Sequence, residues 1–409
     1  MTSRIRLGIA LATIATLGLL ALGCGGAGTG GGGNSSDELV IGEFGSLTGG
    51  EATFGGSTRD GVALALAELT SQKQGKIGGL KVRLVVEDDQ SKPEEAATAV
   101  QKLINQDRVI AVVGEVASSR SLAAAPICQQ NNVPMISPSS TNPKVTQVGD
   151  YIFRMCFLDD FQGRCMAKFA AQNLHLKKVA ILTDKRNDYS VGLTQYFGEA
   201  FKGMGGTIVV EQNYSSGDQD FRAQLTSIKS KNPEGIYVPG YYTEVGLIGR
   251  QARELGIKVP LLGGDGWESE QLLQIGGVDL NNSYYTNHWA LDAPDPKLQA
   301  FLKAYRDKYG KDPDAIAGLA YDAANVLFQS MEHLAESDAK TFAGLGLSKA
   351  GTPDRKDAAK KLRDLIATTT NFPGATGNIT LDENRNASKP AVVIAVKDGK
   401  KTFAATMNP

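Results

Sequence analysis

From residue 38 onward, short apolar runs alternate with segments of helical spacing, and this alternation limits the fold more than any other feature. Apolar runs at 38–45 and 81–89 are each followed by a segment with helical periodicity, at 57–69 and 93–104. Pro93 stands where the second of these helices begins, a position that proline favours. Strands that alternate with helices form parallel sheets that are covered by helices and connected by right-handed crossovers.

The same pattern occurs twice along the chain. The first series continues with expected strands at 109–114, 133–137 and 151–156. A second series begins near residue 158, with expected strands at 178–184, 207–211, 235–239 and 259–265. A length of 409 residues exceeds what one hydrophobic core normally contains. We therefore expect an α/β protein of two Rossmann-like lobes, each a parallel sheet covered by helices.

The last part of the chain returns to both lobes. Amphipathic helices are expected at 296–309, 314–334 and 356–367, and the tail then reads as a strand and a hairpin with D-G-K-K at its turn. A strand tail after a helical block predicts that the chain crosses back to another lobe. The expected lobes are 38–157 with 289–371 and 158–288 with 372–409, hinged by about three crossovers.

The first 37 residues have the composition of a targeting and tethering segment. Residues 1–23 combine Arg4 and Arg6 with an apolar stretch, which is typical of a secretory signal peptide. The signal ends at Cys24, which predicts a lipoprotein that is lipidated there; the alternative is plain secretion with an incidental cysteine. Residues 24–37 are rich in glycine and form a flexible tether. We therefore expect a periplasmic or cell-surface protein that is lipid-anchored to the membrane.

Charge and cysteine content argue against several classes of protein. A net charge of −1 gives no electrostatic basis for binding nucleic acid. The body of the chain contains Cys128, Cys156 and Cys165, an odd number that leaves at least one cysteine unpaired. No C-x-x-C motif indicates zinc or a redox dithiol. We expect neither a metal nor a cofactor.

Catalytic motifs are also absent from the sequence. None of the three histidines, His175, His288 and His333, falls in the loops considered below, and there is no G-x-S-x-G, H-E-x-x-H or P-loop motif. Asp88 and Asp89 stand at the end of the expected strand 81–89, where an acidic pair is usually a solvated turn. We predict that the chain is not an enzyme.

Ligands of open parallel sheets bind at the carboxyl ends of the strands, and two consecutive strand ends in the first series carry hydroxyl groups. Ser118 and Ser119 begin a helix, where free N–H groups and the helix dipole favour an anion. Ser139, Ser140 and Thr141 follow the next strand. The alternative interpretations are a helix N-cap for the first pair and turn chemistry for the second group.

An acidic group follows a strand of the second series. Asp265 lies between two glycines, so that a ligand can approach its carboxylate closely. A carboxylate that faces hydroxyl and amide donors across a cleft is complementary to a zwitterion. The alternative for Asp265 is an N-cap of the next helix. Aromatic side chains near the loops are expected to wall an apolar pocket, with ordinary packing as the alternative: Phe54, Tyr189, Tyr241, Tyr242 and Trp267.

These loops are similar to those of a known family. The segments I-G-E-F-G-S-L-T-G, V-V-G-E-V-A-S-S, I-S-P-S-S-T-N-P, D-D-F-Q-G, V-P-G-Y-Y-T-E and G-G-D-G-W resemble the periplasmic binding proteins of branched-chain amino-acid ABC transporters. The resemblance to this leucine/isoleucine/valine-binding type extends over about residues 38–405. It implies two hinged lobes, the periplasmic binding protein type I fold, that close on one amino acid.

The resemblance also implies roles for single residues on the first lobe. By position in the motifs, Ser118 would bind the ligand α-carboxylate with help from the amide of Ser119. Ser139 would offer its backbone, and Thr141 its hydroxyl, to the charged groups of the ligand. Ser140, between them, belongs to the same ligand-binding loop.

On the second lobe, the resemblance implies that Tyr189 and Tyr241 contact the ligand and that Asp265 holds its α-ammonium. The branched-chain type carries glutamate at the position of Asp265 and commonly tyrosine at that of Phe54, and Trp267 changes the pocket further. We therefore predict capture of a branched-chain or related amino acid and its delivery to an ABC transporter permease. The alternative is a ligand sensor of the same fold that acts on a signalling partner.

Overall fold

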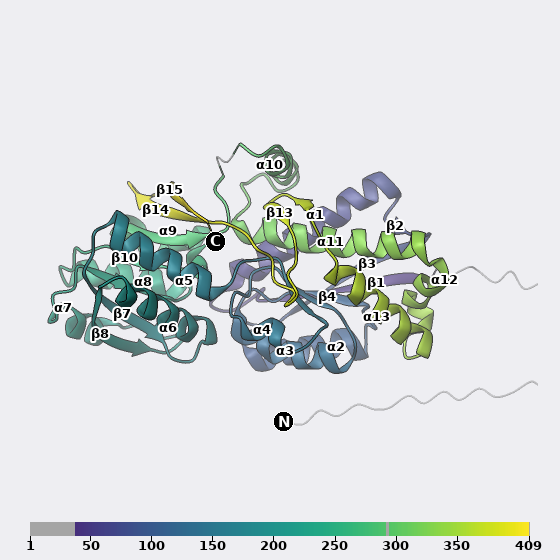
Figure 1. Ribbon diagram of the computed structural model, residues 1–409, viewed down its shortest axis with the longest axis horizontal. Coiled ribbons are helices and arrows are strands. Elements are labelled where there is room, and N and C mark those ends of the chain that lie inside the picture. Colours follow the sequence, from purple (N-terminus) through teal and green to yellow (C-terminus); the bar gives the residue numbers. More distant parts are fainter. Residues whose placement is uncertain (1–36, 292–293, 409) are drawn as a thin grey trace, which may run out of the picture. The chain divides into compact units, whose positions relative to one another are not determined.

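The computed structural model describes residues 37–291 and 294–408. The predicted signal peptide, Cys24 and the glycine-rich tether up to residue 36 lie outside these residues. The described residues form two large sheets and a small two-stranded one (Figure 1). The two series of strands that the sequence predicts lie in different large sheets. Among the helices of the described residues, none is both long and apolar enough to cross a membrane.

The first sheet has the strand order β2-β3-β1-β4-β5-β6. All of its neighbouring strands are parallel except the short pair β2 and β3. Its strands are β1 (Glu38–Gly45), β2 (Lys76–Ile77), β3 (Leu80–Asp88), β4 (Ala111–Val113), β5 (Met135–Ser137) and β6 (Ile152–Arg154).

Helices cover both faces of the first sheet. One apolar cluster unites the sheet with α1, α11 and α13, and a second unites it with α2 and α3. The helices of this part of the chain are α1 (Ala52–Lys73), α2 (Pro93–Asn105), α3 (Ser118–Gln130), α4 (Lys144–Gln147), α10 (Pro296–Tyr309), α11 (Ala315–Ser337), α12 (Ala339–Phe342) and α13 (Pro353–Ala367). Short 3₁₀ turns follow α12, at Ala343–Leu345 and Leu347–Lys349.

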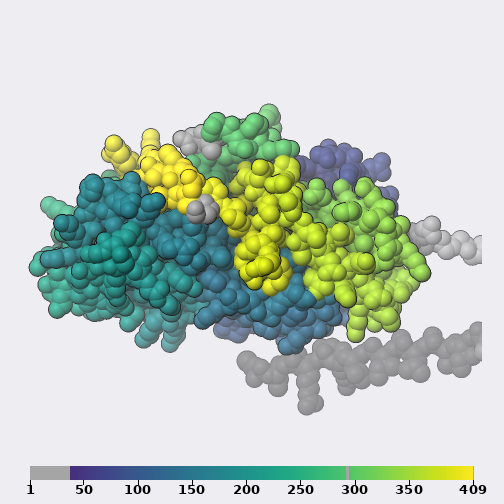
Figure 2. Space-filling model, viewed as in Figure 1, coloured from purple at the N-terminus to yellow at the C-terminus, as the bar shows by residue number. Residues whose placement is uncertain are grey.

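The second sheet has the strand order β15-β14-β11-β10-β9-β7-β8. Its strands from β8 to β11 are parallel, whereas β14 and β15 are antiparallel additions at one edge. The strands are β7 (Lys178–Asp184), β8 (Thr207–Tyr214), β9 (Gly235–Tyr237), β10 (Leu261–Gly263), β11 (Ser283–Asn287), β14 (Ala391–Lys397) and β15 (Lys400–Met407). Figure 2 shows the β14–β15 hairpin, in yellow, on the molecular surface.

One large apolar cluster joins the second sheet to its helices. These are α5 (Asp159–Lys168), a π-helical turn η1 (Phe169–Asn173), α6 (Asp188–Gly203), α7 (Arg222–Lys229), α8 (Tyr242–Glu254), the 3₁₀ turn η2 (Asp265–Trp267), α9 (Glu270–Gly276) and the 3₁₀ turn η3 (Gly277–Leu280). The helix expected after residue 158 therefore ends in a π turn. Cys128, Cys156 and Cys165 are all buried and free.

Strand β11 is a finding that the sequence analysis did not anticipate. Its sequence, S-Y-Y-T-N, lacks an apolar run, yet it lies between β10 and β14 and pairs with both. Two of its buried side chains are hydrogen-bonded to other segments: Thr286 Oγ1 donates to Gln162 Oε1 (2.8 Å), and the Tyr285 hydroxyl donates to Glu268 (2.6 Å). Partners supplied by other segments thus allow a polar sequence to form an interior strand.

The chain passes between the two sheets after β6, after β11 and before β14. The last passage includes the small sheet of β12 (Phe372–Gly374) and β13 (Gly377–Ile379). Ile379, Leu381 and Ala387 pack in the first-sheet cluster, which favours a boundary near residue 390 rather than at 372. The lobe boundaries stay a prediction.

The predicted hairpin at the C-terminal end is present, with β14 paired to β15. Asp398 and Gly399 form its two-residue turn and have φ angles of 50° and 69°. Positive φ at both central positions suits a turn whose twist matches that of the flanking strands. Asp398 tolerates this conformation better than most residues, and glycine adopts it freely.

Replacing Leu327 with alanine tests the packing of the first sheet. Leu327 lies in α11, is 0% exposed and belongs to the first-sheet cluster. Leu327→Ala should lower the free energy of unfolding by about 2–5 kcal/mol, because it removes buried methyl groups and leaves a cavity. Urea denaturation provides the measurement, and Leu291→Ala, at a side chain that is 45% exposed, is the control. Equal effects of the two changes would contradict the packing described here.

Candidate functional site

The loop after β4 presents an uncapped helix N-terminus. Helix α3 begins at Ser118, and its N-cap is Ala117, whose side chain cannot accept a hydrogen bond. Ser118 is therefore not the N-cap, so the alternative interpretation of this serine does not apply. The N–H groups of the first turn of α3 have no side-chain cap, and such groups attract an anion.

The loop after β5 contributes three hydroxyl groups that differ in their surroundings. The Ser140 hydroxyl is hydrogen-bonded to the carbonyl oxygens of Glu115 (2.8 Å) and Val116 (3.0 Å), and thus ties this loop to the loop before α3. The Thr141 hydroxyl is buried and has no hydrogen-bond partner of good geometry among the described residues. Ser140 is therefore engaged within the protein, whereas Thr141 retains a group that a ligand can use.

Ser118 and Ser119 connect the two loops and the two sheets. Ser118 Oγ accepts a hydrogen bond from the Asn142 N–H (3.2 Å) in the loop after β5. Ser119 Oγ donates to Asp188 Oδ2 (3.0 Å) and accepts from the Asp188 N–H (2.9 Å) at the start of α6. Asn142 Nδ2 also donates to the Asp188 carbonyl (2.9 Å). The start of α3 thus contacts the helix that follows β7 of the second sheet.

Asp265 follows β10 and is buried with a full set of hydrogen-bond partners. Its Oδ1 accepts from Gln162 Nε2 (2.9 Å) and from the Tyr189 hydroxyl (3.0 Å). Its Oδ2 lies 2.9 Å from His288 Nε2 and accepts from Ser139 Oγ at 3.4 Å. Helix α9 is capped by Ser269 instead, so Asp265 is not an N-cap. Ser139 lies in the loop after β5 of the first sheet, so the site includes loop residues from both sheets.

Gln162 is a site residue that the sequence analysis did not single out. Its Oε1 accepts from the Asp265 N–H (3.2 Å) and from Thr286 Oγ1 (2.8 Å), and its Nε2 donates to Asp159 Oδ1 (2.9 Å) as well as to Asp265. The D-D-F-Q-G segment contains both Asp159 and Gln162, so a signal was present there. Every polar atom of this side chain is engaged, which fixes the orientation of Asp265.

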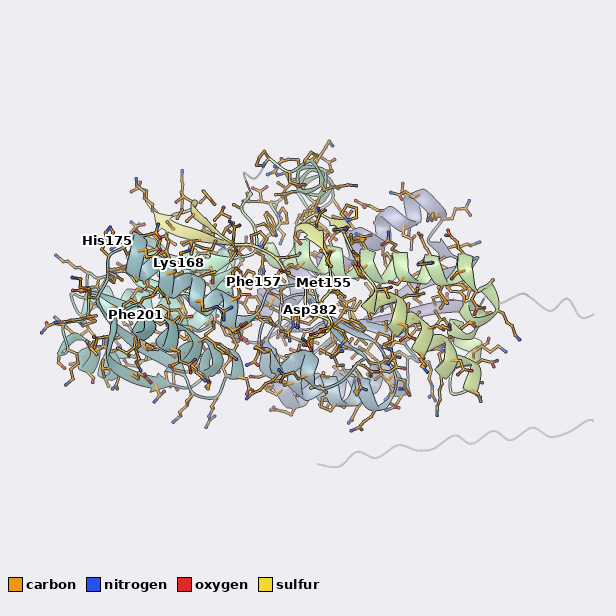
Figure 3. The ribbon with its side chains drawn as sticks, viewed as in Figure 1. Met155, Phe157, Lys168, His175, Phe201 and Asp382 are labelled. Atoms are coloured by element: carbon orange, nitrogen blue, oxygen red, sulfur yellow. The ribbon has the colours of Figure 1, made fainter. Side chains whose placement is uncertain are left out.

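His288 is the second residue that sequence reasoning missed. It follows β11, the strand that lacked an apolar run, and it lies outside the strand-end loops that the sequence favoured. Its ring stacks on Phe157 with centroids 4.0 Å apart, and Figure 3 labels Phe157 in the segment after β6. Nδ1 is buried and has no partner in the described part of the chain. The site therefore contains a histidine that faces its central carboxylate.

Aromatic rings form one wall of the site. Tyr241 stacks on Tyr189 with centroids 5.2 Å apart, and Phe54 of α1 meets Tyr241 edge-on at 5.4 Å. The Tyr241 hydroxyl is buried without a hydrogen-bond partner of good geometry in the described ranges. Burial raises the pKa values of Tyr189 and Tyr241 well above their usual range. Both hydroxyls therefore stay protonated at neutral pH and can donate hydrogen bonds.

Trp267 has different surroundings from the other predicted aromatic residues. Its side chain is fully buried, Nε1 donates to the Val238 carbonyl (3.0 Å), and its ring lies 5.8 Å from that of Tyr285. These contacts belong to the core of the second sheet and favour a packing role. Tyr242 likewise meets Phe54, with centroids 5.2 Å apart.

A buried acidic cluster lies beside the aromatic wall. Arg120 of α3 pairs with Glu51 (3.1 Å) and Glu115 (3.2 Å), and its guanidinium lies 6.0 Å from the centre of the Tyr241 ring. Burial raises the pKa of Glu115 to about 8 despite the proximity of Arg120. Asp89 is 0% exposed and accepts from Ser46 Oγ (2.7 Å), so the expectation of a solvated turn was wrong for this residue.

The geometry defines what the site can bind. One side offers uncapped amides and the Thr141 hydroxyl, which suit an anionic group, and the other offers the Asp265 carboxylate. In the described part of the chain, no group of three or more metal-ligating side chains could hold a metal ion. The arrangement suits a small solute with separated charges and an apolar portion beside the aromatic rings.

Comparisons with known proteins identify the family. The family model described as "Periplasmic binding protein" matches residues 38–401. The chain is 31% identical over 351 residues to the leucine-, isoleucine-, valine-, threonine-, and alanine-binding protein of Pseudomonas aeruginosa, and the alignment covers 85% of this chain and 87% of that protein. The chain belongs to the periplasmic binding protein family. Because this is a family of solute-binding proteins, the prediction that the chain is not an enzyme is confirmed.

Solved structures agree with this conclusion. The leucine binding protein LivK from Thermotoga maritima is 40% identical, with a TM-score of 0.82 and coverage of 91% of this chain and 99% of that one. The branched-chain amino acid transporter substrate binding protein LivJ from Streptococcus pneumoniae, in complex with isoleucine, is 33% identical, with a TM-score of 0.81 and coverage of 91% and 100%. The predicted fold class and family are confirmed, and the ligand roles of single residues stay predictions.

Asp159 provides a test through the pH dependence of stability. Burial, together with the nearby Asp265, raises the pKa of Asp159 from its ordinary 3.8 to about 8. Between these values the folded protein retains a proton that the unfolded chain releases, so the free energy of unfolding falls as pH rises from about 4 to about 8. Asp159→Asn should make this decline less steep. Part of the decline should remain in the variant, because the pKa of Glu115 is also raised by folding.

Thermal unfolding at several pH values between these limits provides the measurement. Asp160→Asn is the matched control, because that neighbouring carboxylate is 32% exposed and pairs with Arg164 at the surface. A slope that is the same in wild type and Asp159→Asn would show that Asp159 does not take up a proton on folding.

Proposed function

We propose that this protein captures an amino acid between its two sheets and holds it by its charged groups. The α-carboxylate binds the uncapped amides of Ser118 and Ser119 and the Thr141 hydroxyl, and the α-ammonium lies beside Asp265. The observation that supports this best is the buried carboxylate of Asp265, which accepts a hydrogen bond from Ser139 of the other sheet. The Tyr241 hydroxyl, which lacks a partner of good geometry, adds a further donor for the ligand.

The ligand class follows from the apolar wall and from the named relatives. Phe54, Tyr189 and Tyr241 form an aromatic surface suited to an apolar side chain. The relatives carry names or titles that specify leucine, isoleucine, valine, threonine and alanine. We therefore infer a branched-chain or related amino acid. Asp265 in place of glutamate, and Phe54 in place of tyrosine, change the details of the pocket.

Capture of the solute serves delivery to an ABC transporter permease in this proposal. A relative of 33% identity is a transporter substrate binding protein by its title, and this favours transport over the alternative of a sensor. Ligand binding would shift the population from open to closed lobes, and the permease would recognise the closed form. The proposed lobes are 38–157 with 289–371 and 158–288 with 372–409, subject to the boundary near residue 390 noted above.

We also propose that the protein is a lipoprotein. The apolar stretch that ends at Cys24 and the glycine-rich residues after it support a lipid anchor followed by a tether. Such an anchor would keep the binding protein close to its permease.

Replacing Asp265 with alanine tests the ammonium site. Asp265→Ala should weaken binding of any α-amino acid by at least about 100-fold, since a buried charge loses its partner. Isothermal titration of the twenty amino acids against wild type and variant provides the measurement. Asp220→Ala, at a side chain that is 69% exposed, should leave affinity unchanged. An Asp265→Ala protein that retains wild-type affinity would mean that the ammonium contact is assigned wrongly.

Replacing Cys24 with serine tests the anchor. The wild-type protein should sediment with membranes, whereas Cys24→Ser should appear in the fraction without membranes, because serine cannot form the thioether on which the lipid is built. Ser35→Ala in the tether is the control and should remain with membranes. A wild-type protein that is released freely would favour plain secretion with an incidental cysteine.

A further inference from the structure

The hydrogen bonds of Asp265 leave no position free for a ligand ammonium. A carboxylate accepts about four hydrogen bonds, two at each oxygen. At Oδ1 the donors are Gln162 and Tyr189, and at Oδ2 the neighbours are His288 at 2.9 Å and Ser139 at 3.4 Å. A ligand that carries an ammonium group must therefore replace one of these donors.

The two donors at Oδ1 are held firmly by other contacts. Gln162 is engaged at both of its polar atoms, and its Oε1 also accepts from the Asp265 N–H. The Tyr189 hydroxyl accepts from the Gly266 N–H (2.8 Å) while it donates to Asp265. Replacing either donor would leave several buried groups without partners. The exchangeable position is therefore at Oδ2.

His288 is the stronger of the two donors at Oδ2, and its position does not depend on Asp265 alone. Its side chain is 1% exposed and its ring stacks on Phe157. The backbone N–H of His288 donates to Asn287 Oδ1 (2.8 Å) at the end of β11. With Asp265 as acceptor, the proton lies on Nε2, and Ser139 Oγ lies 3.3 Å from the same nitrogen. This donor is thus aimed at Oδ2 by the protein itself, at the place where an ammonium would donate.

We propose that His288 is a specificity-determining residue that supplies a hydrogen bond to Asp265 when the ligand has no amino group. The site then also accepts carboxylic acids in which a 2-oxo group replaces the ammonium, because the Asp265 carboxylate is not left without a donor. The carboxylate of such a ligand would occupy the same uncapped start of α3. This inference rests on the proposed amino-acid site and extends its ligand class.

The test compares leucine with 4-methyl-2-oxopentanoate, its 2-oxo analogue, by isothermal titration. The two affinities should agree within about tenfold for the wild-type protein, since one buried hydrogen bond to a charged group is conserved. In His288→Ala, the oxo acid should lose at least about tenfold more affinity than leucine, because leucine supplies its own donor to Asp265. His175→Ala is the matched control, at an exposed histidine that Figure 3 shows well apart from Phe157.

The outcomes separate the two proposals. A wild-type protein that binds leucine but prefers it by more than about tenfold over the oxo acid overturns the role of His288 and leaves the amino-acid site intact. Equal losses of both ligands in His288→Ala, with an unchanged thermal unfolding curve, also overturn it. Should that variant not fold, the wild-type ratio alone decides. A wild-type protein that binds neither probe contradicts the proposed function itself.

Discussion

The buried carboxylate of Asp265 places the strongest constraint on this structure. A charged group that is removed from water must be hydrogen-bonded, because an unpaired one costs several kcal/mol. Asp265 meets this requirement with donors from α5, α6, the end of β11 and the loop after β5. The last of these donors, Ser139, lies in a loop of the first sheet. The hydrogen bonds that Asp265 needs therefore connect loops of both sheets.

The parallel strands explain why these loops meet. In each sheet the strands that precede the site residues, β4, β5 and β10, run in the same direction as their neighbours. Their carboxyl ends therefore lie at one edge, where loops can present polar groups without disturbing the core. Additional hydrogen bonds join the two parts, such as Thr53 with Ser269 (3.0 Å) and Thr243 Oγ1 with the Gly50 carbonyl (2.6 Å). Each of these contacts contributes only about 1 kcal/mol, so together they join the two parts weakly.

Much of the fold and part of the site could be predicted from the sequence. The alternation of apolar runs and helical segments predicted both sheets, and strand-end loops led to Ser139, Tyr189 and Asp265, which the structure brings together. Strand β11 was missed because its sequence has no apolar run, and the periodicity of a sequence does not show that Tyr285 and Thr286 have hydrogen-bond partners in other segments. His288 was missed for the same reason, since it follows that strand.

The sequence also could not predict which charged side chains are buried. Asp89, Glu115 and Arg120 would each be expected at the surface, but they are buried together because each supplies a partner for another. The roles of neighbouring hydroxyls were equally hidden: Ser140 joins two loops by hydrogen bonds to backbone carbonyls, whereas the Thr141 hydroxyl has no partner of good geometry among the described residues. Adjacent residues of similar chemistry thus differ through contacts with distant segments.

The most direct test of the central claim is a crystal structure of the protein with the solute that it retains through purification. The account predicts one small ligand whose carboxylate lies at the first turn of α3, beside Ser118 and Thr141, and whose opposite polar end faces Asp265. A ligand that contacts only one of the two sheets, or that lies away from Asp265, would contradict it.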